Sequence, residues 1–320
     1  MTFLFTCYFK TMAFHWPTFR TRALTAIVFA AVMLTGLLWN EWSFLALFSI
    51  IHFGCWWEYL RLLEKIHRAE YHINLKAGLM LLGYGVMVYV PVASAVLSGG
   101  EPAIDLGRAG AGSVNLHFIL LAAGTLLTMV GVMQQKKISF RIFISAVLGL
   151  LYISLSWGLM LGLYERIDVY GQNTMYAIGA GMMPVLIIAS IWINDTMAYI
   201  VGSFIGKTPL SKVSPKKTWE GTIGGIILCI AVVGFVLPVW LFPGAGGLLM
   251  GFVAIVAAVS AIAGTFGDLL ESKLKRMAGV KDSGHIMPGH GGFLDRFDSL
   301  LLATPAVCLL LLLVLRVLAG

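Results

Sequence analysis

The sequence predicts an all-α fold: a polytopic transmembrane helical bundle of about nine spans, N-in and C-out. Of its 320 residues, 59% are hydrophobic and only 12% are charged, whereas soluble domains carry about 25% charged residues. Apolar runs close to the ~20 residues that cross a bilayer recur along the whole chain. Basic residues gather in alternate connecting segments, which is typical of loops that share one side of a membrane.

Nine apolar runs are the expected spans, and each is bounded by polar or glycine-rich sequence. The first run is expected to be a retained helix, since no small-residue cleavage site follows it before the next run begins. The spans are 22–40, 42–60, 76–97, 116–133, 140–162, 174–201, 221–242, 246–268 and 300–318.

Orientation follows from the 22 Lys and Arg residues, because positive charge favours the inner side of a membrane. With the N-terminus inside, only Arg108, Arg166 and Arg316 lie outside. The net charge of +7 therefore belongs to the inner face, which would attract anionic headgroups and polyphosphates. For a bacterial source, that face belongs to the cytoplasmic (inner) membrane.

Two regions differ in chemistry. Residues 1–190 alternate apolar spans with ordinary loops and are predicted to form a scaffold. Residues 191–320 hold two long inner segments and most of the unusual polar residues, so they are predicted to form the catalytic region, with its site facing the cytoplasm. Four cysteines without CxxC spacing indicate buried small side chains and argue against a disulfide framework or a zinc site.

The first polar block is "GKTPLSKVSPKKTWEGTIGG", residues 206–225. Ser214 and Pro215 end any preceding helix, and Lys216, Lys217 and Thr218 follow directly before the next span. Lysines and a hydroxyl beside a helix N-terminus predict an anion-binding corner. Taken singly, each lysine fits ordinary inner-loop charge equally well.

The second block, residues 267–299, begins "GDLLESKLKR". In a helix, Asp268 and Ser272 share one face, and Lys275 lies three residues further. A carboxylate beside a hydroxyl offers hard oxygen ligands, which suit Mg²⁺. Glu271 and Lys275 can also form an ordinary i,i+4 ion pair.

The same block ends "PGHGGFLDRFDS", where Pro and Gly require irregular backbone. Asp295 and Asp298 face one direction if the last helix begins near Leu294. His290 is expected to shape the glycine turn, and His285 to be a solvated loop residue. Carboxylates, lysines and glycine turns on one membrane side favour metal-assisted phosphoryl or nucleotidyl transfer. The chain has no catalytic-triad spacing and no P-loop motif.

The stretch "SKLKRMAGVKDSGHIMPGHGGFLDRFDS" resembles the signature of the phosphatidate cytidylyltransferases, the CDP-diacylglycerol synthases. "SPKKTWEG" and the upstream "NDTMAY", which contains Asp195, look like a second motif of that family. The resemblance covers residues 191–299, and before residue 190 it extends only to the presence of multiple spans. It implies that CTP and phosphatidate give CDP-diacylglycerol and pyrophosphate with Mg²⁺, with a second cation left open.

The resemblance also suggests roles for individual residues. The expected partners are CTP, phosphatidate and membrane lipid, with no nucleic acid, and a homodimer is left open. The expected metal ligands are Asp268 and Asp295, with Asp298 as a further ligand; the catalytic residues are Lys216, Lys217, Lys275, Asp295 and Arg296; the substrate-binding residues are Ser214, Thr218, Ser272, Lys281, His290, Gly291 and Gly292.

Three other functions remain open at this stage. A CTP-dependent kinase of a polyprenol-like lipid alcohol would share part of the architecture and would transfer the γ-phosphate. An ion-coupled secondary transporter needs carboxylates near the bilayer midplane and related halves, which this sequence does not indicate. A catalytically silent scaffold would require lost site residues, and none is evident.

Overall fold

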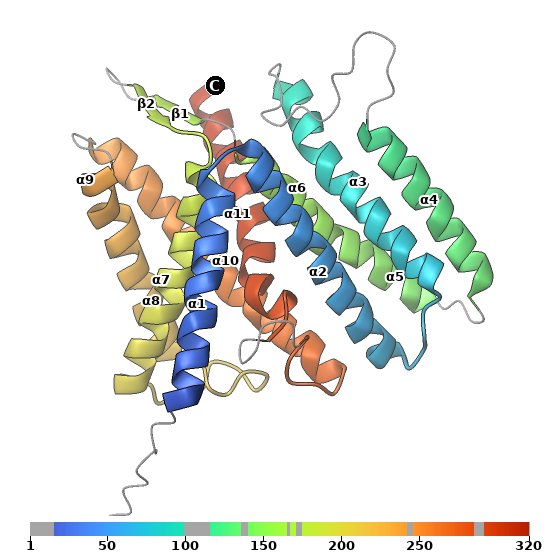
Figure 1. Cartoon of the computed structure of the whole chain (residues 1–320). Coiled ribbons are helices and arrows are strands. Elements are labelled where there is room, and N and C mark those ends of the chain that lie inside the picture. Colours follow the sequence, from blue (N-terminus) through green and yellow to red (C-terminus); the bar gives the residue numbers. More distant parts are fainter. Residues whose placement is uncertain are drawn as a thin grey trace, which may run out of the picture.

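The computed structural model describes residues 16–98, 116–135, 140–164, 167–170, 175–241, 246–284 and 291–319 (Figure 1). Its elements in chain order are α1 (Trp16–Leu38), α2 (Glu41–His67), α3 (Ile73–Ser98), α4 (Leu116–Gln134), α5 (Phe140–Gly149), the π-helix η1 (Leu150–Leu155), α6 (Ser156–Gly162), β1 (Ile167–Tyr170), β2 (Met175–Ile178), α7 (Met182–Ile205), α8 (Trp219–Cys229), the π-helix η2 (Ile230–Val236), α9 (Leu237–Leu241), α10 (Gly247–Met277) and α11 (Leu294–Ala319).

The chain is a helical, multi-pass membrane protein. Among the described residues, seven helical stretches are long and apolar enough to cross a bilayer, the length and composition that burial in lipid demands. They are Ile73–Ala93, Leu116–Gln134, Phe140–Gly162, Met182–Ile205, Trp219–Trp240, Gly247–Met277 and Leu294–Val314. The first two predicted spans coincide with α1 and α2, which are not among the seven. The described apolar part of α1 is short, and α2 carries the buried polar residues His52 and Glu58.

The predicted span 174–201 begins too early. Its first residues form β2, which pairs antiparallel with β1 so that Ile167 faces Ile178. Gly181 then adopts φ +78°, a left-handed conformation that favours glycine, and α7 begins at Met182. The hairpin has no alternating pattern that would distinguish it from the neighbouring apolar runs.

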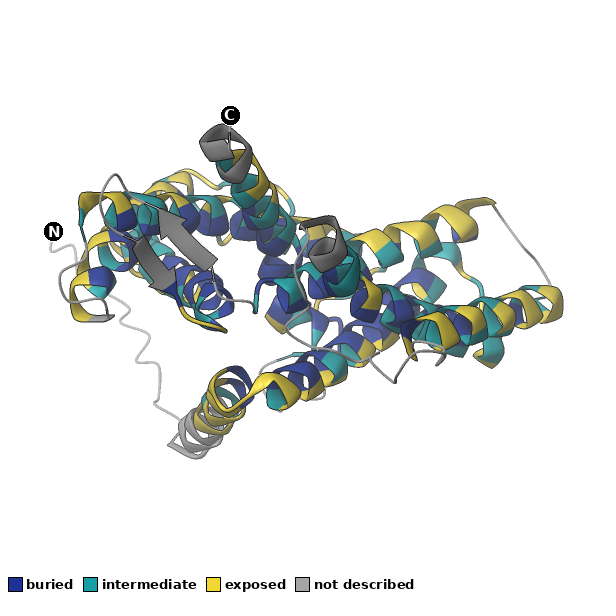
Figure 2. Cartoon of the chain, turned by 90° about the horizontal axis from the view of Figure 1, so that it is seen from above, coloured by how far each residue is buried: buried dark blue, intermediate teal, exposed yellow. Residues whose placement is uncertain are grey.

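The last helix lies between two groups of helices. Figure 1 shows α11 in the middle, with α2 to α6 on one side and α7 to α10 on the other. It packs against α10 most extensively, and also against α6, α7 and α2. Buried residues gather where these helices face one another, and exposed residues cover the outer faces (Figure 2). Many of the exposed residues are large and apolar, as expected for a surface in contact with lipid.

A close approach of α10 and α11 positions two of the predicted carboxylates. A Cβ added at Gly267 would lie 2.5 Å from the Asp298 carbonyl oxygen and 2.9 Å from Ser299 Cα. Glycine therefore lets the two backbones touch, as small residues do in membrane helix pairs. Asp268, the next residue, consequently lies beside the first turn of α11.

The polar segments converge at one end of the bundle. The C-terminal ends of α2, α7 and α10 and the N-terminal ends of α8 and α11 lie at the lower end in Figure 1. The division into a scaffold (1–190) and a catalytic region (191–320) stays a prediction. Residue 190 lies inside α7, and α2 contributes a side chain to the polar cluster described below.

Candidate active site

The loop between α7 and α8 folds back on itself. Thr218 is the N-cap of α8, where its hydroxyl accepts a hydrogen bond from the N–H three residues later. Glu220, in the first turn of α8, accepts two bonds of 3.2 Å from the backbone N–H of Thr208. An antiparallel bridge joins Pro209 to Thr218. The closed loop places Lys216 and Lys217 beside the start of a helix, as the sequence predicts for an anion-binding corner.

A cavity of about 380 Å³ opens beside this loop. It contains the predicted Lys216, Lys217, Thr218 and Asp268 together. Most of the remaining lining residues, which α7, α8 and α10 contribute, were not predicted from the sequence. These are Asn194, Asp195, Ala198, Tyr199, Gly202, Ser203, Thr222 and Thr265.

Lys217 forms an ion pair with Asp268, and both residues line this cavity. Its Nζ lies 2.7 Å from Asp268 Oδ2, so the loop and α10 are joined by an ion pair. Burial alone would lower the pKa of Lys217, but the carboxylates of Asp268 and Asp195 outweigh it and raise that pKa above its ordinary value. Lys217 therefore stays charged wherever these carboxylates are ionised.

A second cavity of about 150 Å³ adjoins the first, and the two share Asp195 and Asp268. Its polar wall holds the predicted Asp295, Arg296 and Asp298, and its other walls are largely apolar. The remaining lining residues are Phe29, Ile188, Ile191, Trp192, Ser299 and Leu300.

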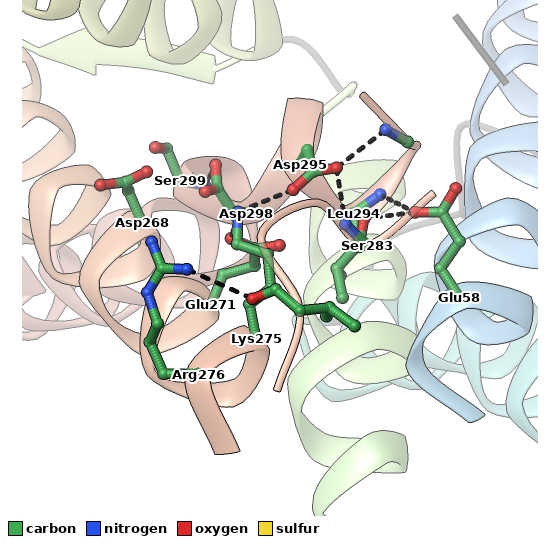
Figure 3. A network of polar contacts seen from close by, with 12 residues as sticks. Glu58, Asp268, Glu271, Lys275, Arg276, Ser283, Leu294, Asp295, Asp298 and Ser299 are labelled. Carbon is green, nitrogen blue, oxygen red and sulfur yellow. Dashed lines mark hydrogen bonds and ion pairs between the residues drawn. The ribbon is translucent and has the colours of Figure 1, made fainter. Parts of the chain in front are cut away.

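Beside the smaller cavity, the start of α11 is held in a closed polar network (Figure 3). Lys275 Nζ contacts Glu271 Oε2 at 2.5 Å and Asp295 Oδ1 at 2.7 Å. The other oxygen of Asp295 accepts bonds from the backbone N–H of Ser283 (2.9 Å) and of Gly292 (2.8 Å). The predicted i,i+4 pair of Glu271 and Lys275 is thus present. Both of its members are buried or nearly so, and Asp295 shares the lysine.

Glu58 completes this network and was not found by reading the sequence. It comes from α2, on the far side of the segment from Asp268 (Figure 3), and accepts three hydrogen bonds from residues 283–294. A single glutamate in an apolar run, more than 200 residues before the signature, carries no local sign of this contact. Asp195 was singled out in the sequence without a role, and it now lines both cavities.

Several predicted site residues line neither cavity, and His285 and His290 lie outside the described residues. Gly291 has φ +84° and precedes the start of α11. Ser272 lies one turn along α10 from Asp268, while Lys281 is exposed. The predicted residues that line neither cavity are Ser214, Ser272, Lys275, Lys281, Gly291 and Gly292.

Comparison with known proteins identifies the family of the chain. The model of the cytidylyltransferase family matches residues 20–314, which is nearly the whole chain. The chain belongs to the cytidylyltransferase family. Relatives named phosphatidate cytidylyltransferase include a Synechocystis protein, 44% identical over 143 residues, with 43% of this chain and 45% of the relative covered. A Staphylococcus saprophyticus protein is 34% identical over 194 residues, covering 60% of this chain and 68% of the relative.

A third relative is phosphatidate cytidylyltransferase 4, chloroplastic, of Arabidopsis thaliana. It is 47% identical over 108 residues, covering 33% of this chain and 26% of the relative. The chain thus matches under half of the length of the Synechocystis relative and about a quarter of the Arabidopsis one.

The residues around the two cavities fit a hard divalent cation. Asp268 and Asp298 both line the smaller cavity, and two carboxylates that face one cavity repel each other unless a proton or a cation lies between them. Within the described residues, no three His, Cys, Asp or Glu side chains are grouped closely enough to hold an ion alone. Mg²⁺ binds through one or two carboxylates and completes its shell with water and substrate phosphate, so Asp268 and Asp298 are chemically suitable ligands for it.

Proposed function

We propose that this chain is an integral membrane nucleotidyltransferase that converts CTP and phosphatidate to CDP-diacylglycerol and pyrophosphate. One observation carries the proposal: two cavities of different character meet at Asp195 and Asp268. The larger holds two lysines and suits a triphosphate, and the smaller joins Arg296 to aromatic and aliphatic side chains. A lipid phosphate needs that second combination, an anion-binding group beside an apolar surface.

Mg²⁺ is the proposed cofactor, held through Asp268 and Asp298, with Asp195 and Asp295 at the edge of the same cavity. When bound, it would neutralise phosphate charge and polarise the α-phosphorus. Asp295 was expected to be a ligand, but both of its oxygens already accept hydrogen bonds within the protein. We therefore assign Asp295 mainly to holding the segment that carries Asp298.

The reaction needs positioning and charge neutralisation more than acid–base groups. Arg296 orients the phosphate of phosphatidate, which is already anionic near pH 7. An oxygen of that phosphate attacks the α-phosphorus of CTP, and the bond from the α-phosphorus to the bridging oxygen of the β-phosphate breaks. Lys216 and Lys217 stabilise the charge on the departing pyrophosphate.

The topology belongs to the same proposal: nine crossings, N-in and C-out, with the site on the cytoplasmic side, where CTP is available. The supporting feature is that the lysine-rich loop between α7 and α8 and the described parts of the signature segment, residues 272–284 and 291–299, lie at one end of the bundle. A cysteine placed at exposed Lys212 is then labelled by an impermeant maleimide only from the cytoplasmic side.

The decisive experiment uses the full chain in detergent with phosphatidate, Mg²⁺ and CTP labelled at either the α- or the γ-phosphate. We expect α-label to enter the lipid and γ-label to leave as pyrophosphate. Lipid labelling from the γ-position alone would instead identify a lipid kinase. CTP turnover in detergent, where no second compartment exists, would also argue against transport.

A further inference from the structure

We infer that Glu58 is a positioning residue for the reaction, because its carboxylate holds the start of α11 against α2 and thereby places Asp298 beside Asp268. The inference rests on the proposed function and extends it to a residue of the N-terminal half. Glu58 is only 1% exposed and lies on α2 between Cys55 and Tyr59, which are also buried. Carboxylates buried among membrane helices are costly and are retained where they bind a partner.

The partners of Glu58 are three hydrogen-bond donors from one segment. Oε2 accepts from Ser283 Oγ at 2.7 Å and from the Leu294 N–H at 2.9 Å. Oε1 accepts from the Phe293 N–H at 2.9 Å. Both carboxylate oxygens are therefore used, and both face the signature segment (Figure 3).

Two of these donors are the N–H groups of Phe293, just before α11, and of Leu294, its first residue, and such N–H groups have no partner within a helix. Glu58 thus caps α11 from a different helix, and its negative charge also interacts favourably with the helix dipole. Phe293 accepts the first intrahelical bonds through its carbonyl, from the N–H groups of Arg296 and Phe297. The position of Glu58 consequently sets the position of the whole first turn of α11.

Glu58 also contacts both sides of the stretch 285–290. A Cβ added at Gly284 or at Gly292 would overlap the Glu58 carboxylate, so these glycines allow the backbone to reach it. Asp295 binds the same two sides, through the N–H groups of Ser283 and Gly292. Two carboxylates, one from α2 and one from α11, therefore fix both flanks of the segment.

The consequence for the reaction lies one turn further along α11. Asp298 follows Leu294 by four residues and lines the smaller cavity together with Asp268 of α10, whose neighbour Gly267 packs against the Asp298 backbone. A shift of about 1 Å in the placement of a reacting group can cost about 10²-fold in rate. In the described part of the chain, the hydrogen bonds of Glu58 all join it to residues 283–294 and none joins it to the loop between α7 and α8, so losing it should lower kcat and leave the KM for CTP nearly unchanged.

The test is Glu58→Gln in the full chain, with Glu41→Gln as a matched control at the opposite, exposed end of α2. Glutamine keeps the size but turns one acceptor into a donor that faces other donors. We expect kcat to fall about 10²-fold, with the KM for CTP changed less than about threefold. Hydrogen exchange at the amides of residues 292–296 should rise, and the control should match the wild type in each measurement.

A wild-type kcat in Glu58→Gln, or an equal loss through KM alone, would overturn the inference. If Glu58→Gln fails to fold, Ser283→Ala removes one of the three bonds and keeps the charge. A fall in its kcat of about three- to tenfold supports the inference, and a wild-type kcat overturns it. If the wild type transferred no α-label, the proposed function would fail instead. The exchange measurement would still decide whether Glu58 holds α11.

Discussion

Asp298 and Asp295 both belong to the first turn of α11 and both line the smaller cavity, but they differ in what binds them. Asp298 shares this cavity with Asp268, which also lines the larger one. Asp295 is bound by Lys275 and two backbone N–H groups, so its charge is satisfied within the protein. We therefore expect the two aspartates to have separate tasks, with Asp298 facing substrate and Asp295 holding the segment in place.

Substitution of Asp268, which lines both cavities, should have the largest effect on the reaction. Asp268→Asn removes a charge shared by both cavities, and we expect activity to fall about 10³-fold or more, with the fold retained. Glu70→Gln, an exposed carboxylate at the same end of the bundle, is the control and should be silent. Incorporation of α-label into lipid measures activity, and the melting temperature checks the fold. Retained activity in Asp268→Asn would contradict the proposed role of Asp268 in the reaction.

Substitution of Lys275, which binds Glu271 and Asp295, should lower the stability of the protein first. Lys275→Met leaves Glu271 and Asp295 buried without their cation, and removing one partner of such a group costs about 3–5 kcal/mol. We expect a large drop in the melting temperature in detergent. Lys273→Met, on the exposed face of the same helix turn, is the control and should change little. An unchanged melting temperature with lost activity would instead place Lys275 on the substrate.

The lysine loop gives the next effect. Lys217→Met removes a cation from the larger cavity, and we expect kcat/KM for CTP to fall about 10²-fold. Lys212 is an exposed lysine of the same loop that lines neither cavity, so Lys212→Met tests whether loop charge alone matters. Equal losses in the two variants would favour general attraction of CTP by the loop over a specific contact.

The fold could be predicted from the sequence wherever the length of an apolar run was enough to identify a helix. Each of the nine predicted spans overlaps a helix, and the last helix begins at Leu294, which is the start that would let Asp295 and Asp298 face one direction. The hairpin before α7 was missed because its strands are as apolar as the span that follows. The helical extension of α10 to Met277 was expected only from the i,i+4 spacing of Asp268 and Ser272.

The site was readable only where its residues lie close together in sequence. The loop lysines and the signature aspartates could be found because short motifs carry them. The different partners of these aspartates depend on the packing of α10, α2 and α11, which no local spacing encodes. Glu58 shows this most clearly, since its partners lie more than 220 residues away.

The smallest effect is expected at Thr218. Its substitution tests whether this hydroxyl mainly caps α8 or binds the nucleotide. Its hydroxyl caps α8 and its side chain also lines the larger cavity. If capping is its main role, Thr218→Ala should cost about 1 kcal/mol of stability, and Thr218→Ser should restore it. Melting temperature and kcat/KM for CTP are then measured on both variants. A fall in kcat/KM with unchanged stability in Thr218→Ala would show that the hydroxyl binds substrate, because a lost cap cannot leave stability untouched. That outcome would move Thr218 from the residues that shape the loop to those that face the nucleotide, together with Lys217.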